Sequence, residues 1–374
     1  MIERGRISSF QLAVMMNPTI IATALLIIPS ITAAKAERDM WLSQVWGSLM
    51  GHLAVLLAIL LHKHYPNLTV IEYAQQIVGK IPGKLIGIGY IFTYLHVNGI
   101  ILREYGEFIA GSFLFKTPMT VILGSMALVC AFSVRGGLET IARTAQHFVP
   151  MVITLWLIIV IFLLGDLKVE NMFPMFENGI TPSMMGATTP GAWFSEYFLI
   201  AFILPYINDR EKATKWANIS VISVLFILVL TNLVALLVFG EITSDLMYPV
   251  MNAARYVSIA EFFQHLESVV MAIWILGTFI KISVFYYVLA LGFAQLLNLS
   301  EYKTMVLPLG FLLVCVAMWS APNLTALKEF LGTALVFYLI FMHIVLPGIL
   351  LLITLIRKKI NRKLQGSKDE QPSF

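Results

Sequence analysis

The sequence predicts an all-α integral membrane protein with ten transmembrane helices, arranged as two inverted repeats of five, in which the first and sixth helices are broken. Three observations support this fold class. Hydrophobic residues make up 59% of the 374 positions and charged residues 12%. A soluble domain averages about 45–50% apolar residues and about 25% charged residues. Apolar runs recur at membrane-spanning length, and two of them carry a proline near each end. One aqueous core could not hide so much apolar surface, so the lipid bilayer is the expected solvent.

The apolar runs define the predicted helices, because a helix needs about 20 apolar residues to cross the hydrocarbon layer. The run at 187–207 is the weakest, since Pro190, Ser195, Glu196 and Pro205 interrupt it. Short helices are expected in two connections, at 66–80 and 241–265. The ten predicted spans cover residues 9–34, 41–61, 86–114, 118–134, 145–165, 187–207, 215–240, 266–297, 304–320 and 330–356.

Lysine and arginine in the loops predict the orientation, since they favour the cytoplasmic side. With the N-terminus inside, most basic residues fall on the inner side, and the tail after the last span adds more. We therefore expect both termini in the cytoplasm. The outer side holds only a small basic set, namely Lys35, Arg38, Lys116, Lys168, Arg255 and Lys328.

The whole chain, 1–374, is expected to form a single transmembrane domain. Residues 8–165 are the first inverted repeat, 187–357 the second, and 358–374 a cytoplasmic tail. Repeats of this kind build many secondary transporters, whose ligands bind near the midplane at broken helices. The first span reads NPTIIATALLIIP, from Asn17 to Pro29, and the sixth reads PGAWFSEYFLIAFILP, from Pro190 to Pro205. A pair of ordinary proline-kinked packing helices is the alternative.

Other classes of protein are disfavoured. The formal net charge of +4 argues against nucleic acid as a partner. Cys130 and Cys315 both lie within apolar runs, so they suggest neither a disulfide framework nor a metal site. The sequence has no metal-spaced cluster, nucleophile elbow or Gly-rich phosphate loop. We therefore expect no enzyme activity, no cofactor and no catalytic residues.

Several short motifs together resemble the endospore germination permeases, the B subunits of nutrient germinant receptors, within the amino acid–polyamine–organocation transporter superfamily. The first span carries Ala22-Thr23-Ala24-Leu25 before Pro29, where the superfamily signature has glycines at the two alanine positions. The other motifs are Arg103-Glu104-Tyr105-x-Glu107, Thr117-Pro118, Arg135-Gly136-Gly137-Leu138-Glu139, Phe194-Ser195-Glu196, Pro205-Tyr206 and Phe279-Ile280-Lys281-Ile282-Ser283. The resemblance implies partner A and C subunits and residence in the spore inner membrane.

Lys281 is the most informative charge, because ionisable groups at bilayer depth usually mark a function or an ion pair. No acidic residue lies within one helical turn of it. Its partner is therefore expected from another span: Glu196, a carbonyl freed by the break in the first span, or water. In sodium-coupled proteins of this fold, a sodium ion joins the first and eighth helices, and the hypothesis is that the Lys281 ammonium replaces that ion. Snorkelling toward an interface and a permanent structural pair are the alternatives.

Arg103 and Glu107 in the third span can pair at i,i+4. They are assigned a coupling role together with Lys281, although a purely structural pair near the outer end is as reasonable. Glu104 is expected on a different face of the helix, and His343 is interpreted as a satisfied interhelical donor. The predicted ligand-binding residues are Ala22, Thr23, Ala24, Leu25, Tyr94, Asn98, Phe194, Ser195, Glu196, Tyr197 and Thr278.

Two functions remain open from the sequence, besides a channel or ion-conducting assembly component, which would require an oligomer. The first is a sensor that binds a small nutrient, such as an amino acid, in a midplane pocket and signals germination through partner subunits. The second is a proton-coupled amino-acid permease. A fold can host either activity, so the sequence alone does not separate them.

Overall fold

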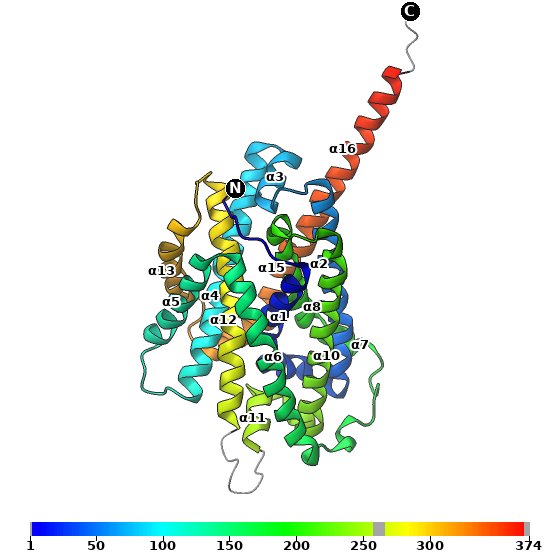
Figure 1. Ribbon diagram of the computed structural model, residues 1–374. Helices are drawn as coiled ribbons and strands as arrows, with labels where there is room; N and C mark the ends of the chain where they lie inside the picture. The colour runs from blue at the N-terminus through cyan, green and yellow to red at the C-terminus, as the bar shows by residue number, and fades with distance from the viewer. Residues whose placement is uncertain (1, 257–265, 370–374) are drawn as a thin grey trace, which may run out of the picture.

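The computed structural model describes residues 2–256 and 266–369, and its long helices run side by side between two ends of the molecule (Figure 1). The start of α1 and the end of α16 lie at the same end, and α11 lies at the opposite end (Figure 1). In chain order the principal helices are α1 Ser9–Ala36, α2 Met40–His64, α3 Val70–Val78, α4 Lys80–Ser112, α5 Met119–Gly136, α6 Leu138–Leu163, α7 Thr181–Gly186, α8 Thr188–Ser195, α9 Ile200–Ile203, α10 Ala213–Phe239, α11 Pro249–Tyr256, α12 Glu267–Leu296, α13 Lys303–Trp319, α14 Leu324–Gly332, α15 Ala334–Ile340 and α16 Leu346–Asp369.

The helices agree with a membrane protein, although the count of ten remains a prediction. In the described part of the chain, seven helical segments are long and apolar enough to cross a membrane, or eight if the bent pair α13 and α14 counts as one span. The first of these segments, Ser9–His64, contains two predicted spans. The predicted span at 187–207 consists of short helices and is not among the seven.

Helix α1 corrects one prediction, because it is a continuous α-helix of 28 residues with Pro18 and Pro29 inside it. Each proline removes one backbone donor and can bend a helix without interrupting it. Ala22 and Ala24 also oppose unwinding, since their Cβ atoms restrict the backbone where the superfamily signature has glycine. The predicted break in the first span is therefore wrong.

The break in the sixth span is confirmed. Helix α8 ends at Ser195, and the chain continues as a 3₁₀ turn, η4 (Glu196–Leu199), before α9 and a second 3₁₀ turn, η5 (Leu204–Tyr206). Every residue of η4 is buried. A 3₁₀ turn inside a span changes the direction of side chains relative to a regular helix, and here it directs Glu196 toward the middle of the protein.

The short connections form helices as expected. α3 lies within 66–80 and begins with a capping box between Thr69 and Glu72, which satisfies backbone donors that the helix cannot pair internally. The 3₁₀ helix η7 (Gly240–Ser244) begins one residue before the segment 241–265, and α11 lies within it. The remainder of that segment, 257–265, lies outside the described residues.

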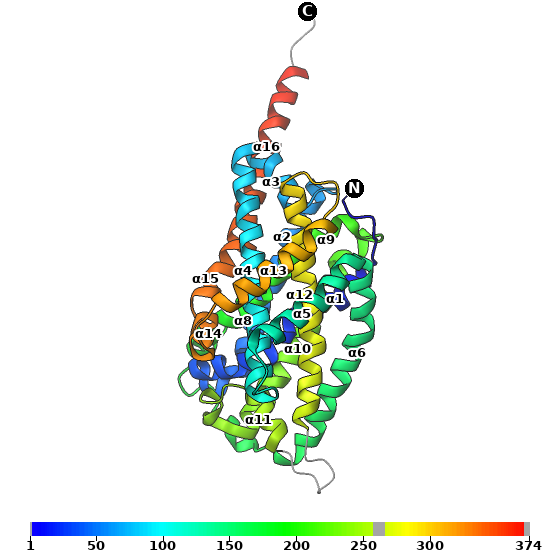
Figure 2. The same cartoon turned by 90° about the vertical axis from the view of Figure 1, so that its left-hand side faces the viewer.

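α1 and α12 form the centre of the fold. Nearly all side chains of α1 are buried, and α1 packs against α6, α10 and α12. α12 is also packed against α4 and α5 (Figure 2). Both helices are apolar on all sides, as expected for spans that contact protein rather than lipid. A charged residue on either helix must therefore find its partner inside the protein.

Two features distinguish the C-terminal part of the chain, from α13 to α16. α13 and α14 meet at a bend of 98°. α15 passes through a single π-helical turn, Phe341–Val345, into the long helix α16. α16 extends beyond the helical bundle (Figure 1).

Candidate functional site

A buried ion pair joins three elements at the centre of the fold. Lys281 Nζ on α12 lies 2.8 Å from Glu196 Oε2 on η4 and donates a second hydrogen bond to Thr23 Oγ1 on α1 at 2.9 Å. The Lys281 side chain is 0% exposed and that of Glu196 is 3% exposed. Burying both charges is costly unless they are paired and hydrogen-bonded, so this geometry fixes the relative positions of α1, η4 and α12.

Trp193 strengthens the same junction. Its indole Nε1 donates to Thr23 Oγ1 at 2.8 Å, so Thr23 accepts one hydrogen bond from α8 and one from α12. The Lys281 ammonium also lies 5.6 Å from the centre of the Phe285 ring, within the range of a cation–π contact. Among the three partners considered for Lys281, the structure selects Glu196. The contact on α1 is a threonine hydroxyl rather than a freed carbonyl.

The close approach of α1 and α12 depends on small residues beside this junction. A Cβ built on Gly277 would lie 3.3 Å from the Cβ of Ala22. Gly277 is one turn before Lys281, and Ala22 precedes Thr23, so the helix crossing and the ion pair share one location. Ala22 therefore has a packing role in this structure. Ala24 is also fully buried.

Four other predicted residues lie around the ion pair. Asn98 on α4 donates to the carbonyl of Ile282 at 3.4 Å, next to Lys281 on α12. Tyr94 packs edge-to-face on Phe285, with ring centres 5.8 Å apart. Ser195 precedes Glu196, and Thr278 precedes Lys281 by nearly one turn on α12. Among the residues that the structure describes, Tyr94 Oη, Asn98 Oδ1 and Thr278 Oγ1 have no hydrogen-bond partner.

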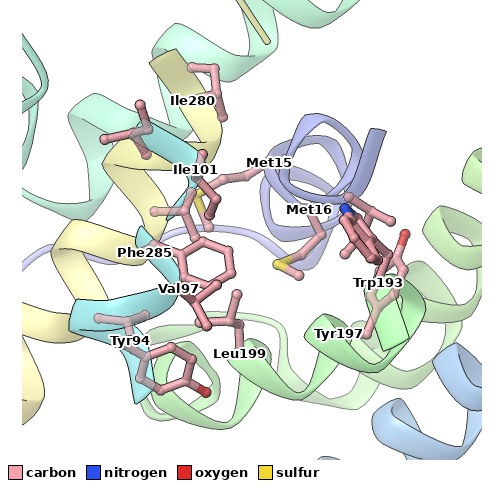
Figure 3. Packing of buried hydrophobic residues seen from close by; sticks show 14 of the residues in the cluster. Met15, Met16, Tyr94, Val97, Ile101, Trp193, Tyr197, Leu199, Ile280 and Phe285 are labelled. Carbon is pink, nitrogen blue, oxygen red and sulfur yellow. The ribbon is translucent and has the colours of Figure 1, made fainter. Parts of the chain in front are cut away.

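Two predicted wall residues face away from this group. Tyr197 Oη is 2.9 Å from Ser220 Oγ on α10, and Phe194 packs against Gly51 on α2. Figure 3 shows Met15 and Met16 of α1 between two sets of side chains: Tyr94 and Phe285 on one side, Trp193 and Tyr197 on the other. The aromatic residues chosen from the sequence therefore belong to two separate surfaces.

Arg103 and Glu107 form the expected i,i+4 pair, with Arg103 Nη2 and Glu107 Oε1 2.7 Å apart. The guanidinium also donates to the carbonyls of Ala317 at 3.5 Å and Met318 at 3.2 Å. These carbonyls belong to the last turn of α13, where a helix lacks internal donors and favours a cation. These contacts join α4 to α13, and the coupling role of Arg103 and Glu107 stays a prediction.

Glu104 was missed as a site residue. Its side chain is 2% exposed, and its Oε1 has no hydrogen-bond partner within the described residues. It interacts electrostatically with both Lys281 and Glu196. Helical periodicity correctly places Glu104 on a different face of the helix from Arg103. Because α4 is buried on several sides, that other face also lies inside the protein. A second carboxyl in the same span was the available signal.

The site is closed. A cavity of about 30 Å³ lies beside α1 and is lined almost entirely by apolar side chains, including Ala22, Leu25 and Trp274. Ligand pockets for small molecules are roughly ten times larger. Leu25 therefore lines a space that fits about one water molecule, and a larger ligand requires the surrounding helices to separate.

The chain is similar in sequence to a family of spore germination proteins. The family described as "Spore germination protein" matches residues 6–325. Spore germination protein KB of Bacillus subtilis is 25% identical over 98% of this chain and 99% of its own length. YndE of the same organism is 26% identical over 83% and 87%, and protein XB of Bacillus anthracis is 24% identical over 83% and 86%.

Solved structures show the fold. Mhp1, a nucleobase-cation-symport-1 family transporter in a closed conformation with bromovinylhydantoin bound, has a TM-score of 0.68 at 15% identity, covering 92% of this chain and 78% of its own. MhsT in complex with L-phenylalanine has a TM-score of 0.67 at 11% identity, covering 93% and 89%. The predicted transporter fold is thus confirmed. With the family matching most of its length, this chain belongs to the spore germination permease family.

Proposed function

We propose that this chain is the membrane subunit of a nutrient germinant receptor, which binds a small ligand such as an amino acid between α1, η4 and α12 and passes the signal to partner subunits. The buried junction of Lys281, Glu196 and Thr23 carries the proposal. A charged pair this deep is expensive to bury, and charges inside a membrane protein usually serve binding or coupling. The names of the relatives, all spore germination proteins, support the same reading.

The junction suggests how binding could become a signal. A ligand with charged groups can exchange partners with Lys281 and Glu196, because each is held by the other. Such an exchange alters the contact that holds α12 to α1 and η4. A ligand can shift a conformational equilibrium only through different contacts in the two states, and this ion pair provides that difference.

Thermal unfolding of the purified chain in the presence of single nutrients tests the proposal. A ligand that binds the folded state raises the unfolding temperature, and its stabilisation grows with the logarithm of one plus the ratio of its concentration to Kd. We expect at least one amino acid to stabilise the wild type, and Lys281→Met to lose that response. Lys215→Met is the matched control, since Lys215 is exposed near the start of α10. A full response in a folded Lys281→Met variant would overturn the role of the junction.

A proton-coupled permease is the second candidate, and buried Glu104 favours it. One oxygen of the Glu104 carboxyl has no hydrogen-bond partner within the described residues, and such a carboxyl beside an ion pair can take up and release a proton as the pair changes. Saturable amino-acid uptake into liposomes that contain this chain alone would favour the permease, and Glu104→Gln would then abolish its dependence on a proton gradient. Absence of uptake, together with ligand binding, favours the receptor.

The proposal includes A and C partner subunits and a location in the spore inner membrane, with both termini on the cytoplasmic side. The arrangement of the helices supports the sidedness, because the start of α1 and the end of α16 lie at one end (Figure 1). Basic residues gather there, among them Arg4, Arg6 and the Arg357-Lys358-Lys359 run on α16. Protease accessibility of tags at the two termini in oriented vesicles tests the orientation.

A further inference from the structure

His343 is a buried polar residue that the proposed function does not use. It is 0% exposed and belongs to the π-helical turn Phe341–Val345. Such turns are rare, and they frequently mark functional sites because they redirect side chains relative to a regular α-helix. Tyr90 Oη on α4 donates to the carbonyl of Met342 at 2.9 Å, which anchors this turn to α4.

The hydrogen bonds around His343 determine what its ring can offer. Ser195 Oγ donates its single hydrogen to the carbonyl of Ala192 at 2.6 Å. Ser195 can therefore only accept from His343 Nδ1, which lies 3.2 Å away. A neutral imidazole that donates through one nitrogen accepts through the other. His343 Nε2 is consequently an acceptor, and within residues 2–256 and 266–369 it has no partner.

Asn98 and Tyr94 present similar atoms from α4. The Asn98 amide nitrogen donates to Ile282, so its free atom is Oδ1, an acceptor. Tyr94 lies one turn away on the same helix, and its ring stacks on that of His343 with centres 5.9 Å apart. Asn98 is 0% and Tyr94 is 1% exposed. The Asn98 oxygen and the Tyr94 hydroxyl have no partner elsewhere in the described chain.

These atoms share one chemical preference. Buried polar groups are normally hydrogen-bonded, and an exception needs an explanation. His343 Nε2 and Asn98 Oδ1 both require a donor, and the Tyr94 hydroxyl can accept as well as donate. The Glu196 carboxylate interacts electrostatically with Tyr94, although one Glu196 oxygen already accepts a hydrogen bond from Lys281. A group rich in N–H donors fits this set, whereas a carboxylate does not.

We propose that His343, Asn98 and Tyr94 form a subsite for the amine or ammonium group of the ligand, with His343 Nε2 and Asn98 Oδ1 as its acceptors. This subsite deepens the proposed function, on which it rests for the identity of the bound molecule. It assigns the amine to the side of η4 that faces α4 and the π-turn. The Lys281 junction is left for the remainder of the ligand.

Two small cations test the subsite without knowledge of the natural ligand. Methylammonium has three N–H donors, and tetramethylammonium has the same charge and none. We expect methylammonium chloride to raise the unfolding temperature of the full chain in detergent, and tetramethylammonium chloride at the same concentration to have no such effect. His343→Phe should weaken methylammonium binding about 10- to 100-fold, the usual effect of one lost hydrogen bond to a charged group.

His96→Phe is the matched control, because His96 lies on the same helix as Asn98 and contacts aromatic rings of Phe92 and Phe330. It should bind methylammonium as the wild type does. If His343→Phe does not fold, Asn98→Leu carries the same expectation. Equal stabilisation by the two cations, or an unchanged methylammonium response in folded His343→Phe, would overturn the subsite.

A second arm separates this inference from the proposed function. L-alanine is compared with propionate, which lacks only the amine. Stabilisation by L-alanine alone, lost in His343→Phe, supports both proposals. Equal stabilisation by the two compounds overturns the subsite and leaves the receptor proposal standing. Methylammonium binding without a response to any amino acid supports the subsite and counts against the proposed nutrient.

Discussion

Replacing Lys281 by Met should destabilise the protein more than almost any other single change in the chain. The substitution leaves the Glu196 carboxyl 3% exposed and without its ammonium partner. Removing one member of a buried pair costs about 3–5 kcal/mol, which lowers the ratio of folded to unfolded protein by about 10²- to 10⁴-fold. Lys215→Met, on the exposed start of α10, should change stability by less than about 0.5 kcal/mol.

A double-mutant cycle turns this expectation into a measurement of the pair. Glu196→Gln alone leaves the Lys281 ammonium buried without the carboxylate it is bonded to, whereas the double variant removes both charges of the pair. We therefore expect the double variant to be more stable than either single variant. Unfolding in mixed micelles, followed by tryptophan fluorescence, gives the three free energies. Additive losses would show that the two side chains do not interact and would refute the reasoning.

Three further changes probe the surroundings of the site. Arg103→Met should lower the free energy of unfolding by about 1–3 kcal/mol, because the last carbonyls of α13 lose their donor. Ligand affinity measured on the same sample should stay unchanged, and a selective loss of affinity would support a coupling role. Gly277→Leu should overpack the contact with Ala22 and lower stability by about 1–3 kcal/mol, which thermal unfolding would detect, with an unaltered midpoint counting against the close crossing. Partial burial acts to raise the pKa of Asp209, but hydrogen bonds from Ser9 outweigh this effect and lower the pKa from its ordinary 3.8. The contact between Asp209 and Ser9 therefore stabilises the folded state fully above pH 3.8. This stabilisation is lost as the pH falls through the lower pKa of the folded state. Proteolysis of the N-terminal segment should therefore accelerate at low pH, and Asp209→Asn should remove the pH dependence.

The ion pair was predictable as one of a few choices because the spans contain so few charges. A lysine buried in α12 needs an acid, and Glu196 was one of three partners that the sequence left open. Thr23 was expected to contribute as part of an unwound backbone, yet it contributes its hydroxyl from an intact helix. The proline rule predicts where a helix loses a hydrogen bond. It does not predict whether neighbouring residues such as Ala22 and Ala24 keep the helix continuous.

The missed residues have a different cause. Periodicity assigns residues to faces of a helix, but it does not tell which faces are buried. α4 buries Arg103 and Glu104 alike, so separating their faces did not remove Glu104 from the interior. The placement of the His343 side chain depends on a π-turn, and such turns have no recognisable sequence pattern. The free nitrogen of His343 followed from two hydrogen-bond distances that only the three-dimensional structure provides.

The continuity of α16 has a mechanical consequence. The helix begins directly after the π-turn that holds His343 and contains 24 residues, so it is a rod of about 36 Å. A tilt of about 10° at its base displaces the far end of such a rod by about 6 Å. Small rearrangements around Ser195 and His343 would thereby be amplified outside the bundle, where another protein can detect them without reaching the ligand.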